Sequence, residues 1–298
     1  GWKRHVDTVM EQFAPATELH CAHLMRQLEI RAAAAGIKLE NALAIAVENE
    51  GEDEREKKYR EEKCTTFVTE EADTPGVITL TQNEDFDLRA ALNIVVLCSI
   101  VAGQVTFALR YIATWGGTSV TARANKLFGV NSLPQLSAGG GVGRNAVASL
   151  YANNGHPADI EVFQTIPRAS GYSFVAVSQD NEVIQIESTH DDVEMTRPGL
   201  GHVHTNHRQT ERMSHVEAGF DTSHSRRRLA HARQQVRPTM SSEERRALLE
   251  QPPINRGQRT IARVEARWNS GPLEMDVWLL REAARGWVTY NLRPLFGT

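Results

Sequence analysis

The sequence predicts an α+β fold in which helices and antiparallel strands form separate layers. Residues 1–62 carry apolar side chains at helical spacings, and after residue 64 β-branched residues alternate with polar ones. No regular alternation of single strands with single helices occurs, which disfavours a parallel sheet. A chain of 298 residues can bury a large core, and its 41% hydrophobic and 23% charged residues are typical of a globular protein.

The individual elements follow from local composition. The first 62 residues should be helical, and they end in an almost entirely charged run at 48–63 that is typical of an exposed helix or a linker. Strands are expected at residues 77–81, 92–98, 104–112, 173–177, 182–187, 260–267, 274–280 and 287–291. Helices are expected at residues 145–151, 158–165 and 211–249, with serines at 241 and 242 as helix caps.

Charge and composition disfavour several functions. A net charge of -4 argues against a general nucleic-acid binder, and the three arginines at 226–228 are interpreted as a solvated helix face. Three cysteines are too few for a disulfide framework, so we expect a reducing, cytoplasmic compartment. The apolar run at 90–102 is shorter than the ~20 residues that cross a bilayer, so no membrane partner is expected. The glycine-rich stretch at 137–143 lacks the Gly-Lys-Ser/Thr ending of a phosphate-binding loop.

Cys64 stands at the boundary between the charged run and the first strand-like segment. A cysteine in this position can be a small buried residue of the core or a nucleophile, and its position alone does not decide between them. An accessible charged segment directly before the thiol is what an internal cleavage of the Lys63–Cys64 bond would require.

A histidine-rich segment offers a different chemistry. The spacing of His202, His204 and His207 is similar to the His-x-His-x-Asp-His cluster of binuclear zinc hydrolases, and imidazoles two residues apart on an extended segment can bind one ion. Asn206, however, occupies the acidic position and is a poor metal ligand. We therefore expect no metal, and a zinc-dependent hydrolase is kept as the alternative function.

Short motifs between residues 20 and 215 occur in a characteristic order. They are Cys-Thr-Thr at 64–66, Gln-Asn-Glu-Asp-Phe at 82–86, a Gly-Val-Asn-Ser turn at 129–132, a Gly-Val helix start at 141–142 and Val-His-Thr-Asn-His at 203–207. In this order they resemble the acyl-coenzyme A:6-aminopenicillanic acid acyltransferase (isopenicillin-N acyltransferase, peptidase C45) family of N-terminal nucleophile hydrolases. The resemblance implies a four-layer αββα fold, with residues 1–63 as a helical pro-segment and residues 64–298 as the catalytic domain.

The resemblance also implies an autoprocessing cysteine amidohydrolase or acyltransferase. Cys64 would be the nucleophile, with Asp85 and Asn206 as catalytic partners. Cleavage of the Lys63–Cys64 bond would give Cys64 a free α-amine with a pKa near ~8, which is a competent base at neutral pH. The amide of Asn206 would donate to the oxyanion without titrating, and Asp85 would orient the α-amine and the thiol.

Substrate-binding residues are implied in the same way. Arg256, or failing that Arg259, would bind a substrate carboxylate, and Thr66 and Thr189 lie near positions where the family has hydroxyl residues. The expected substrate is a small amide or an acyl-coenzyme A thioester, with no further cofactor. After cleavage, the pro-segment would be the α chain of a heterodimer.

Two residues depart from the family pattern. Lys63 stands where the family usually has glycine, whose backbone freedom assists cleavage, and Glu84 stands where it has an aromatic residue. An unprocessed, inactive family member is therefore the second alternative.

Overall fold

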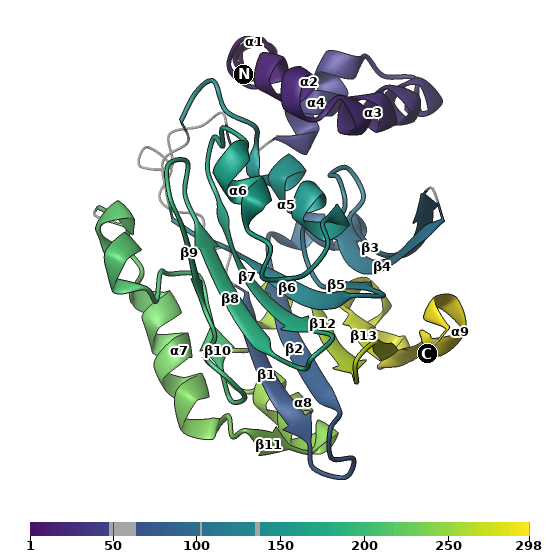
Figure 1. Cartoon of the computed structure of the whole chain (residues 1–298), viewed down its shortest axis with the longest axis vertical. Helices are drawn as coiled ribbons and strands as arrows, with labels where there is room; N and C mark the ends of the chain where they lie inside the picture. Colours follow the sequence, from purple (N-terminus) through teal and green to yellow (C-terminus); the bar gives the residue numbers. More distant parts are fainter. Residues whose placement is uncertain (48–49, 51–63, 102, 135–137, 218, 298) are drawn as a thin grey trace.

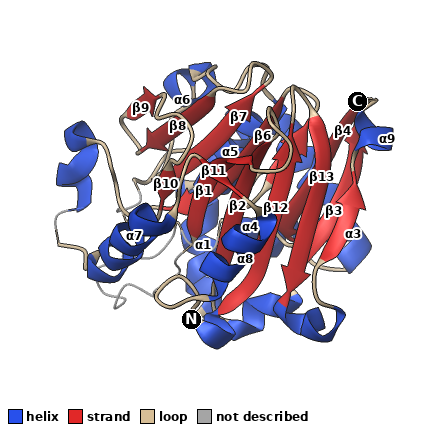
Figure 2. Ribbon diagram, turned by 90° about the horizontal axis from the view of Figure 1, so that it is seen from below, coloured by secondary structure: helices blue, strands red, loops and turns tan. Residues whose placement is uncertain are grey.

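The computed structural model describes residues 1–47, 50, 64–101, 103–134, 138–217 and 219–297. Lys63 and most of the charged run predicted at 48–63 lie outside the described residues. In the part of the chain that is described, two seven-stranded sheets face each other, and helices cover their outer sides (Figure 1). Seen from below, the strands form the centre of the molecule and the helices lie around them (Figure 2). The predicted αββα arrangement is confirmed.

The first sheet, sheet A, carries the strand that follows Cys64. Its strand order is β10 (Val203–His204), β1 (Thr65–Glu71), β2 (Ile78–Asp85), β12 (Thr260–Trp268), β13 (Pro272–Leu279) and β14 (Val288–Asn291), with β11 (Thr239–Met240) beside β1. Only the β1–β11 pair is parallel among the described pairings of this sheet. The β1–β2 register places Thr65 opposite Asn83, so the start of β1 lies beside the end of β2.

The second sheet, sheet B, follows the chain almost strand by strand. Its order is β3 (Ile94–Val101), β4 (Gln104–Tyr111), β5 (Thr121–Arg123), β6 (Lys126–Ser132), β7 (Tyr172–Ser178), β8 (Val183–Ser188) and β9 (Val193–Thr196). Leu80, Val264 and Met275 of sheet A pack against Leu109 and Val175 of sheet B, in an apolar core between the sheets. Because side chains alternate along a strand, β1 and β2 send every second residue into this space and the others toward the outer helices.

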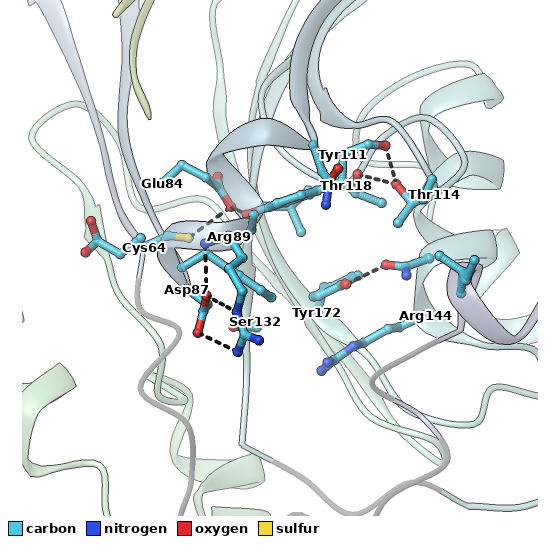
Figure 3. A pocket seen from close by; sticks show the side chains of 18 residues that line it. Cys64, Glu84, Asp87, Arg89, Tyr111, Thr114, Thr118, Ser132, Arg144 and Tyr172 are labelled. Atoms are coloured by element: carbon cyan, nitrogen blue, oxygen red, sulfur yellow. Dashed lines mark hydrogen bonds and ion pairs between the residues drawn. The ribbon is translucent and has the colours of Figure 1, made fainter. Parts of the chain in front are cut away.

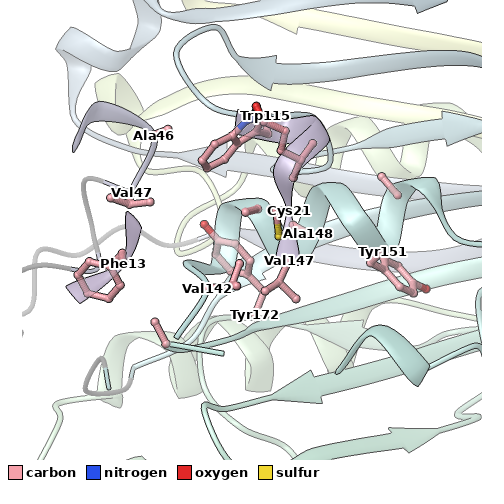
Figure 4. Close-up of a cluster of buried hydrophobic side chains, with 14 of the residues drawn as sticks. Phe13, Cys21, Ala46, Val47, Trp115, Val142, Val147, Ala148, Tyr151 and Tyr172 are labelled. Atoms are coloured by element: carbon pink, nitrogen blue, oxygen red, sulfur yellow. Dashed lines mark hydrogen bonds between the residues drawn. The ribbon is translucent and has the colours of Figure 1, made fainter. Parts of the chain in front are cut away.

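In the described part of the chain, six helices share one apolar cluster with the outer face of sheet B. They are α1 (Trp2–Gln12), α2 (Ala14–His20), α3 (Ala22–Ala35), α4 (Leu39–Ala46), α5 (Arg144–Asn153) and α6 (Glu161–Thr165). Buried side chains from the first four helices share one cluster with α5, α6 and the sheet, and Figure 4 shows Phe13 and Cys21 in it with Trp115 and Tyr151. The indole of Trp115 also donates to the carbonyl oxygen of Leu24 at 3.0 Å. The predicted pro-segment is therefore packed against the predicted catalytic domain.

Among the residues described, two helices cover the outer face of sheet A, α7 (Ser223–Gln235) and α8 (Ser242–Glu250). Their apolar residues Leu229 and Leu248 pack with Phe67 of β1. Ser241 caps α8, as the sequence predicted, and forms a capping box with Glu244. The remaining helical segments are η1 (Leu88–Leu92), η2 (Glu211–Glu217), η3 (Gly257–Arg259), η4 (Leu280–Arg285) and α9 (Arg293–Phe296).

The region predicted as helical at 211–249 forms η2, α7 and α8, and the chain pairs through β11 between α7 and α8, where Pro238 cannot continue a helix. Two sequence predictions of local structure were wrong. Residues 129–132 are not a turn but the end of β6, paired with β7. The helix predicted at 158–165 forms only at Glu161–Thr165, where Asp159 accepts a hydrogen bond from the backbone N–H of Glu161. No helix within the described ranges combines the length and the apolar character that crossing a membrane requires.

Candidate active site

Cys64 lies directly before β1 on the wall of a cavity of about 480 Å³. Its residue is 5% exposed, and its side chain points into the space between the sheets, as the even-numbered Thr66 does. The cavity wall also includes Glu84, Tyr111 and Arg144 (Figure 3). Asp85 contributes to the wall as well. A volume of this size suits a small organic substrate.

Glu84 is the side chain that contacts the thiol. The Sγ atom of Cys64 donates to Glu84 Oε1 at 3.4 Å, and the Tyr111 hydroxyl donates to the same oxygen at 2.9 Å. Ser119 Oγ and Gln82 Nε2 each donate to Glu84 Oε2 at 2.7 Å. Burial raises the pKa of Glu84, and these hydrogen bonds lower it in part. The sequence marked Glu84 only as a departure from the family, and nothing local to it showed this role.

Asp85, the last residue of β2, points the other way, toward the helices outside sheet A. Its Oδ1 atom accepts from Thr260 Oγ1 at 2.6 Å, and within the described structure its buried Oδ2 has no hydrogen-bond partner. Burial raises the pKa of Asp85 to about 7, although the positive charges of Arg228 and Arg256 lower it. Asp85 can therefore exchange a proton near neutral pH.

The Cys64 thiol is protonated in this environment. Burial raises its pKa well above the usual value, and the carboxylates of Glu84 and Asp85 raise it further. A hydrogen bond from the backbone of Asp85 and the charge of Arg228 act in the opposite direction but are weaker. A nucleophile in this state needs a base that removes its proton during attack.

Arg228 connects the two predicted catalytic residues Cys64 and Asn206. Its Nη1 atom donates to the carbonyl oxygen of Cys64 at 2.5 Å and to Thr65 Oγ1 at 2.7 Å, and its Nη2 atom donates to Asn206 Oδ1 at 2.8 Å. The amide nitrogen of Asn206 donates to the carbonyl oxygen of Ser132 at 2.9 Å. Asn206 is thus held at both ends of its amide.

The solvated face predicted for residues 226–228 is wrong at Arg228, which is fully buried. On α7 the buried residues are Ser225, Arg228, Leu229 and Ala232. These positions have helical spacing, so the periodicity of the segment already placed Arg228 on the face that turns inward.

Thr66 faces the space between the two sheets. Its hydroxyl is within 2.8 Å of Gln82 Oε1 and 3.2 Å of Asn131 Oδ1. Gly129 on β6 faces the same spot, and a Cβ atom there would collide with the Gln82 side chain. The glycine of the predicted Gly-Val-Asn-Ser motif therefore makes room for Gln82, which in turn contacts Glu84.

The other predicted substrate-binding residues lie farther from the cavity. Arg256 is close enough to lower the pKa of Asp85, and its backbone N–H donates to Thr260 Oγ1 at 3.0 Å. Thr189 follows β8, where its hydroxyl accepts from the backbone N–H of Asp192 at 2.8 Å. Of the described residues that line the cavity, none is Thr66, Thr189 or Arg256. Their roles in substrate binding stay predictions.

The three histidines of the zinc alternative each have a different partner. His202 Nε2 is 2.8 Å from Gln185 Oε1 on β8, whereas His204 Nε2 is 2.9 Å from Glu187 Oε1 and His207 Nδ1 is 2.9 Å from Ser225 Oγ. Burial lowers the pKa of His202 and of His207 to about 3. Over the residues described, no three histidine, cysteine or carboxylate side chains are grouped to hold an ion. Within the described ranges, His202, His204 and His207 therefore do not converge on one point.

Comparison with known proteins supports the resemblance read from the motifs. Residues 158–256 match the model of the family "Acyl-coenzyme A:6-aminopenicillanic acid acyl-transferase". This match includes Asn206 and Arg228 and begins after Cys64. No sequence among the curated proteins matches the chain.

Solved structures with a similar fold include N-terminal nucleophile hydrolases. The Caenorhabditis elegans ortholog of N-acylethanolamine-hydrolyzing acid amidase has a TM-score of 0.50 at 12% identity, and the alignment covers 77% of this chain and 100% of that one. A variant of conjugated bile acid hydrolase from Clostridium perfringens has a TM-score of 0.51 at 8% identity, with 78% and 93% covered.

Together these findings agree with the predicted enzyme class, an acyltransferase or amidohydrolase. The chain therefore has the N-terminal nucleophile hydrolase fold and, over residues 158–256, matches the acyl-coenzyme A:6-aminopenicillanic acid acyltransferase family that its motifs predicted.

Proposed function

We propose that the chain is a cysteine amidohydrolase or acyltransferase that acts through an acyl-Cys64 thioester. The observation that carries this proposal is the position of the Cys64 thiol on the cavity wall, where it contacts Glu84, with Asn206 joined to the Cys64 backbone through Arg228. A thiol, proton acceptors and a fixed amide are the groups that acyl transfer needs.

The proposed reaction has two steps. Sγ of Cys64 attacks the carbonyl carbon of an amide or of an acyl-coenzyme A thioester, and the amine or thiol leaves as the acyl-enzyme forms. Water, or an acceptor amine, then attacks the thioester and releases the Cys64 thiol. Asn206 is the proposed oxyanion donor, which requires its amide nitrogen to exchange the Ser132 carbonyl for the substrate oxygen.

Autoprocessing is part of the proposal. Cleavage before Cys64 would separate residues 1–63 from residues 64–298, and the first part would stay bound as an α chain through its packing around Phe13 and Trp115. Intact-mass analysis tests this directly, because an uncut chain has a mass of 33.2 kDa. A single uncut species with an unreactive Cys64 would instead support the inactive family member.

The Cys64→Ala variant tests the nucleophile. It is assayed with N-acyl 4-nitroanilides of increasing acyl chain length and with acyl-coenzyme A thioesters in the presence of an amine. We expect release of nitroaniline and of free coenzyme A to stop. The matched control is Cys98→Ser, because Cys98 is an exposed free thiol on β3. Turnover at the wild-type rate by Cys64→Ala would refute the proposal, and loss of turnover on addition of a chelator would favour the zinc alternative.

A further inference from the structure

The carboxyl group of Glu84 is placed to do more than fill the position of an aromatic residue. It is 4% exposed, and Oε1 accepts the Sγ–H of Cys64 at 3.4 Å. A contact of this length is within the range of hydrogen bonds from a thiol, and a proton can pass along it. Asp85, by comparison, has its Oδ1 atom directed at Thr260, on the other face of sheet A.

We propose that the carboxylate of Glu84 is the general base that takes the Sγ proton of Cys64 during acyl transfer. This inference rests on the proposed acyl-Cys64 chemistry and assigns its proton acceptor to a side chain. The thiol of the uncut chain would then be activated without the α-amine that cleavage before Cys64 would create.

The hydrogen bonds around Glu84 are those expected of an ionised carboxylate, which can accept a proton. In the described part of the chain its two oxygens accept from four side chains, those of Cys64, Tyr111, Ser119 and Gln82. The amide of Gln82 is oriented by Thr66, whose hydroxyl donates to Gln82 Oε1 at 2.8 Å, so Nε2 faces Glu84. An amide NH₂ can only donate, and an ionised carboxylate offers about four acceptor sites. The surroundings therefore suit the ionised form.

The charged and titratable groups near Glu84 come from several elements. Cys64 precedes β1, Asp85 is the next residue of β2, Tyr111 ends β4, and Arg144 begins α5 on the far side of the cavity. Arg228 of α7 lies behind Cys64 and Asp85. No described hydrogen bond or ion pair joins Glu84 to a cation, and burial raises its pKa, which moves it toward the pH at which the enzyme would work.

In the proposed reaction, Glu84 accepts one proton and returns it in each of the two steps. The S–H bond of Cys64 breaks as its proton moves to Glu84 Oε1, and the sulfur forms a bond to the carbonyl carbon. When the C–N bond of the tetrahedral intermediate breaks, the protonated carboxyl returns the proton to the leaving amine. In deacylation Glu84 takes a proton from the attacking water, and that proton returns to the sulfur when the S–C bond breaks.

The test uses Glu84→Gln in the full chain, with 4-nitrophenyl butyrate and N-butyryl 4-nitroanilide as probes. Glutamine keeps the volume but cannot accept a proton, so anilide turnover should fall by about 10²–10⁴-fold. The ester should be affected less, because 4-nitrophenolate leaves without being protonated. Equal losses for both probes would overturn the proton-donor half of the inference.

A second measurement separates a base from a merely electrostatic neighbour. The Glu84 carboxylate raises the pKa of Cys64, so Glu84→Gln should lower that pKa and speed alkylation of Cys64 by iodoacetamide near neutral pH. A general base predicts faster alkylation together with slower turnover. If turnover instead rose or stayed constant with the larger thiolate population, Glu84 would be no base. Peptide masses locate the adduct, and Cys98→Ser removes the exposed competing thiol.

Failure of this inference and failure of the proposed function give different results. If Cys64→Ala is inactive and Glu84→Gln keeps the wild-type pH profile of kcat/KM, the acyl-Cys64 chemistry stands and the α-amine is the base. If turnover is found only in chains cut before Cys64, the activation of the uncut thiol is refuted. If Cys64→Ala is active, the proposed function fails and the inference fails with it.

Discussion

Two buried glutamates, Glu84 on sheet A and Glu187 on sheet B, face the space between the sheets with different partners. Glu187 is fully buried, and its Oε1 atom lies 2.9 Å from Nε2 of His204. Gln209 and Thr210 also donate to it, and although burial raises its pKa, these bonds and His204 hold the pKa at about 2. Glu84 is surrounded by neutral donors, and its pKa is raised. Burial therefore does not decide the direction of the pKa shift alone: at Glu187 the contacts with its partners outweigh burial, and at Glu84 the hydrogen bonds do not.

The two glutamates are ends of one buried polar chain. It runs from Glu84 to Gln82 (2.7 Å), Thr66 (2.8 Å), Asn131 (3.2 Å), His204 (3.1 Å) and Glu187 (2.9 Å). The Glu187 end fixes the position of β10 and of the segment that carries Asn206, because His204 belongs to β10. In the proposed reaction, the Glu84 end exchanges a proton. One network thus joins a glutamate whose pKa is lowered to about 2 to a glutamate whose pKa is raised.

The largest effect on stability is expected from Glu187→Ala. The change leaves three buried or half-buried donors, from His204, Gln209 and Thr210, without their acceptor, and each unsatisfied buried group costs about 1–3 kcal/mol of unfolding free energy. Urea denaturation measures the loss. The control is Glu182→Ala, whose ion pair with Arg197 is solvent-exposed and should contribute about 0–1 kcal/mol. Similar values for the two variants would contradict a structural role for Glu187.

The next effect concerns Arg228, the cation that Cys64 and Asp85 share. Arg228→Met removes the donors to Cys64 O and Asn206 Oδ1 and raises the pKa of the thiol, so we expect at least about a hundredfold loss of kcat/KM for the anilide. Arg227→Met is the matched control, because Arg227 is the exposed neighbour on the same helix. If both variants kept wild-type kcat/KM, the bridge between Cys64 and Asn206 would have no role in turnover.

The sequence predicted several residues of this site but not the hydrogen bonds that join them. The order of the motifs led to Cys64, Asp85 and Asn206, because short motifs carry local information. Arg228 bonds to Cys64 across 164 positions, a pairing that no local pattern contains. Likewise, Glu84 was visible as an unusual residue, but only the register of β1 and β2 shows that it faces the thiol.

The sequence likewise predicted the long strands of the fold but not the short ones. Long strands with period two, such as β4 and β12, were found because alternation is a strong signal over eight or nine residues. β5 and β11 contain three and two residues, too few for any period, and β11 exists because it pairs with β1. The end of β6 was interpreted as a turn because residues 129–132 resemble the Gly-Phe-Asn-Ser turn of the family, whereas here they pair with β7 and Gly129 accommodates Gln82.

The pH dependence of stability should separate the two kinds of carboxyl. The pKa of Asp85 is about 7 in the folded chain, so between about pH 4 and pH 7 the folded state holds a proton that the unfolded state loses. Stability should fall as pH rises through this window, by at most about 1.4 kcal/mol per pH unit for this group. Glu187, with a pKa of about 2, contributes above pH ~4 and loses its contribution as pH falls toward 2.

Two variants, each denatured with urea at a series of pH values, assign the two parts of this pH dependence to Asp85 and to Glu187. The part below about pH 4 is called the acid limb. Asp85→Asn should flatten the slope between about pH 4 and pH 7 and leave the acid limb unchanged. Glu187→Gln should flatten the acid limb and leave the slope of stability between about pH 4 and pH 7 unchanged. A wild-type slope that persists in Asp85→Asn would mean that another group takes up the proton, and Glu84 is the first to examine because its pKa is raised as well.

The smallest effect is expected at Tyr111, whose hydroxyl donates to the same oxygen of Glu84 as the thiol does. Tyr111→Phe removes one hydrogen bond that lowers the pKa of Glu84, so this pKa should rise. Because a base acts only when unprotonated, the acid limb of the kcat/KM profile should move to higher pH with the plateau changed little. Ser119→Ala, which removes a donor from the other oxygen, should move the limb in the same direction. An unshifted limb in both variants, with the limb lost in Asp85→Asn, would place the titrating base at Asp85 and reverse the roles assigned to these neighbouring carboxyls.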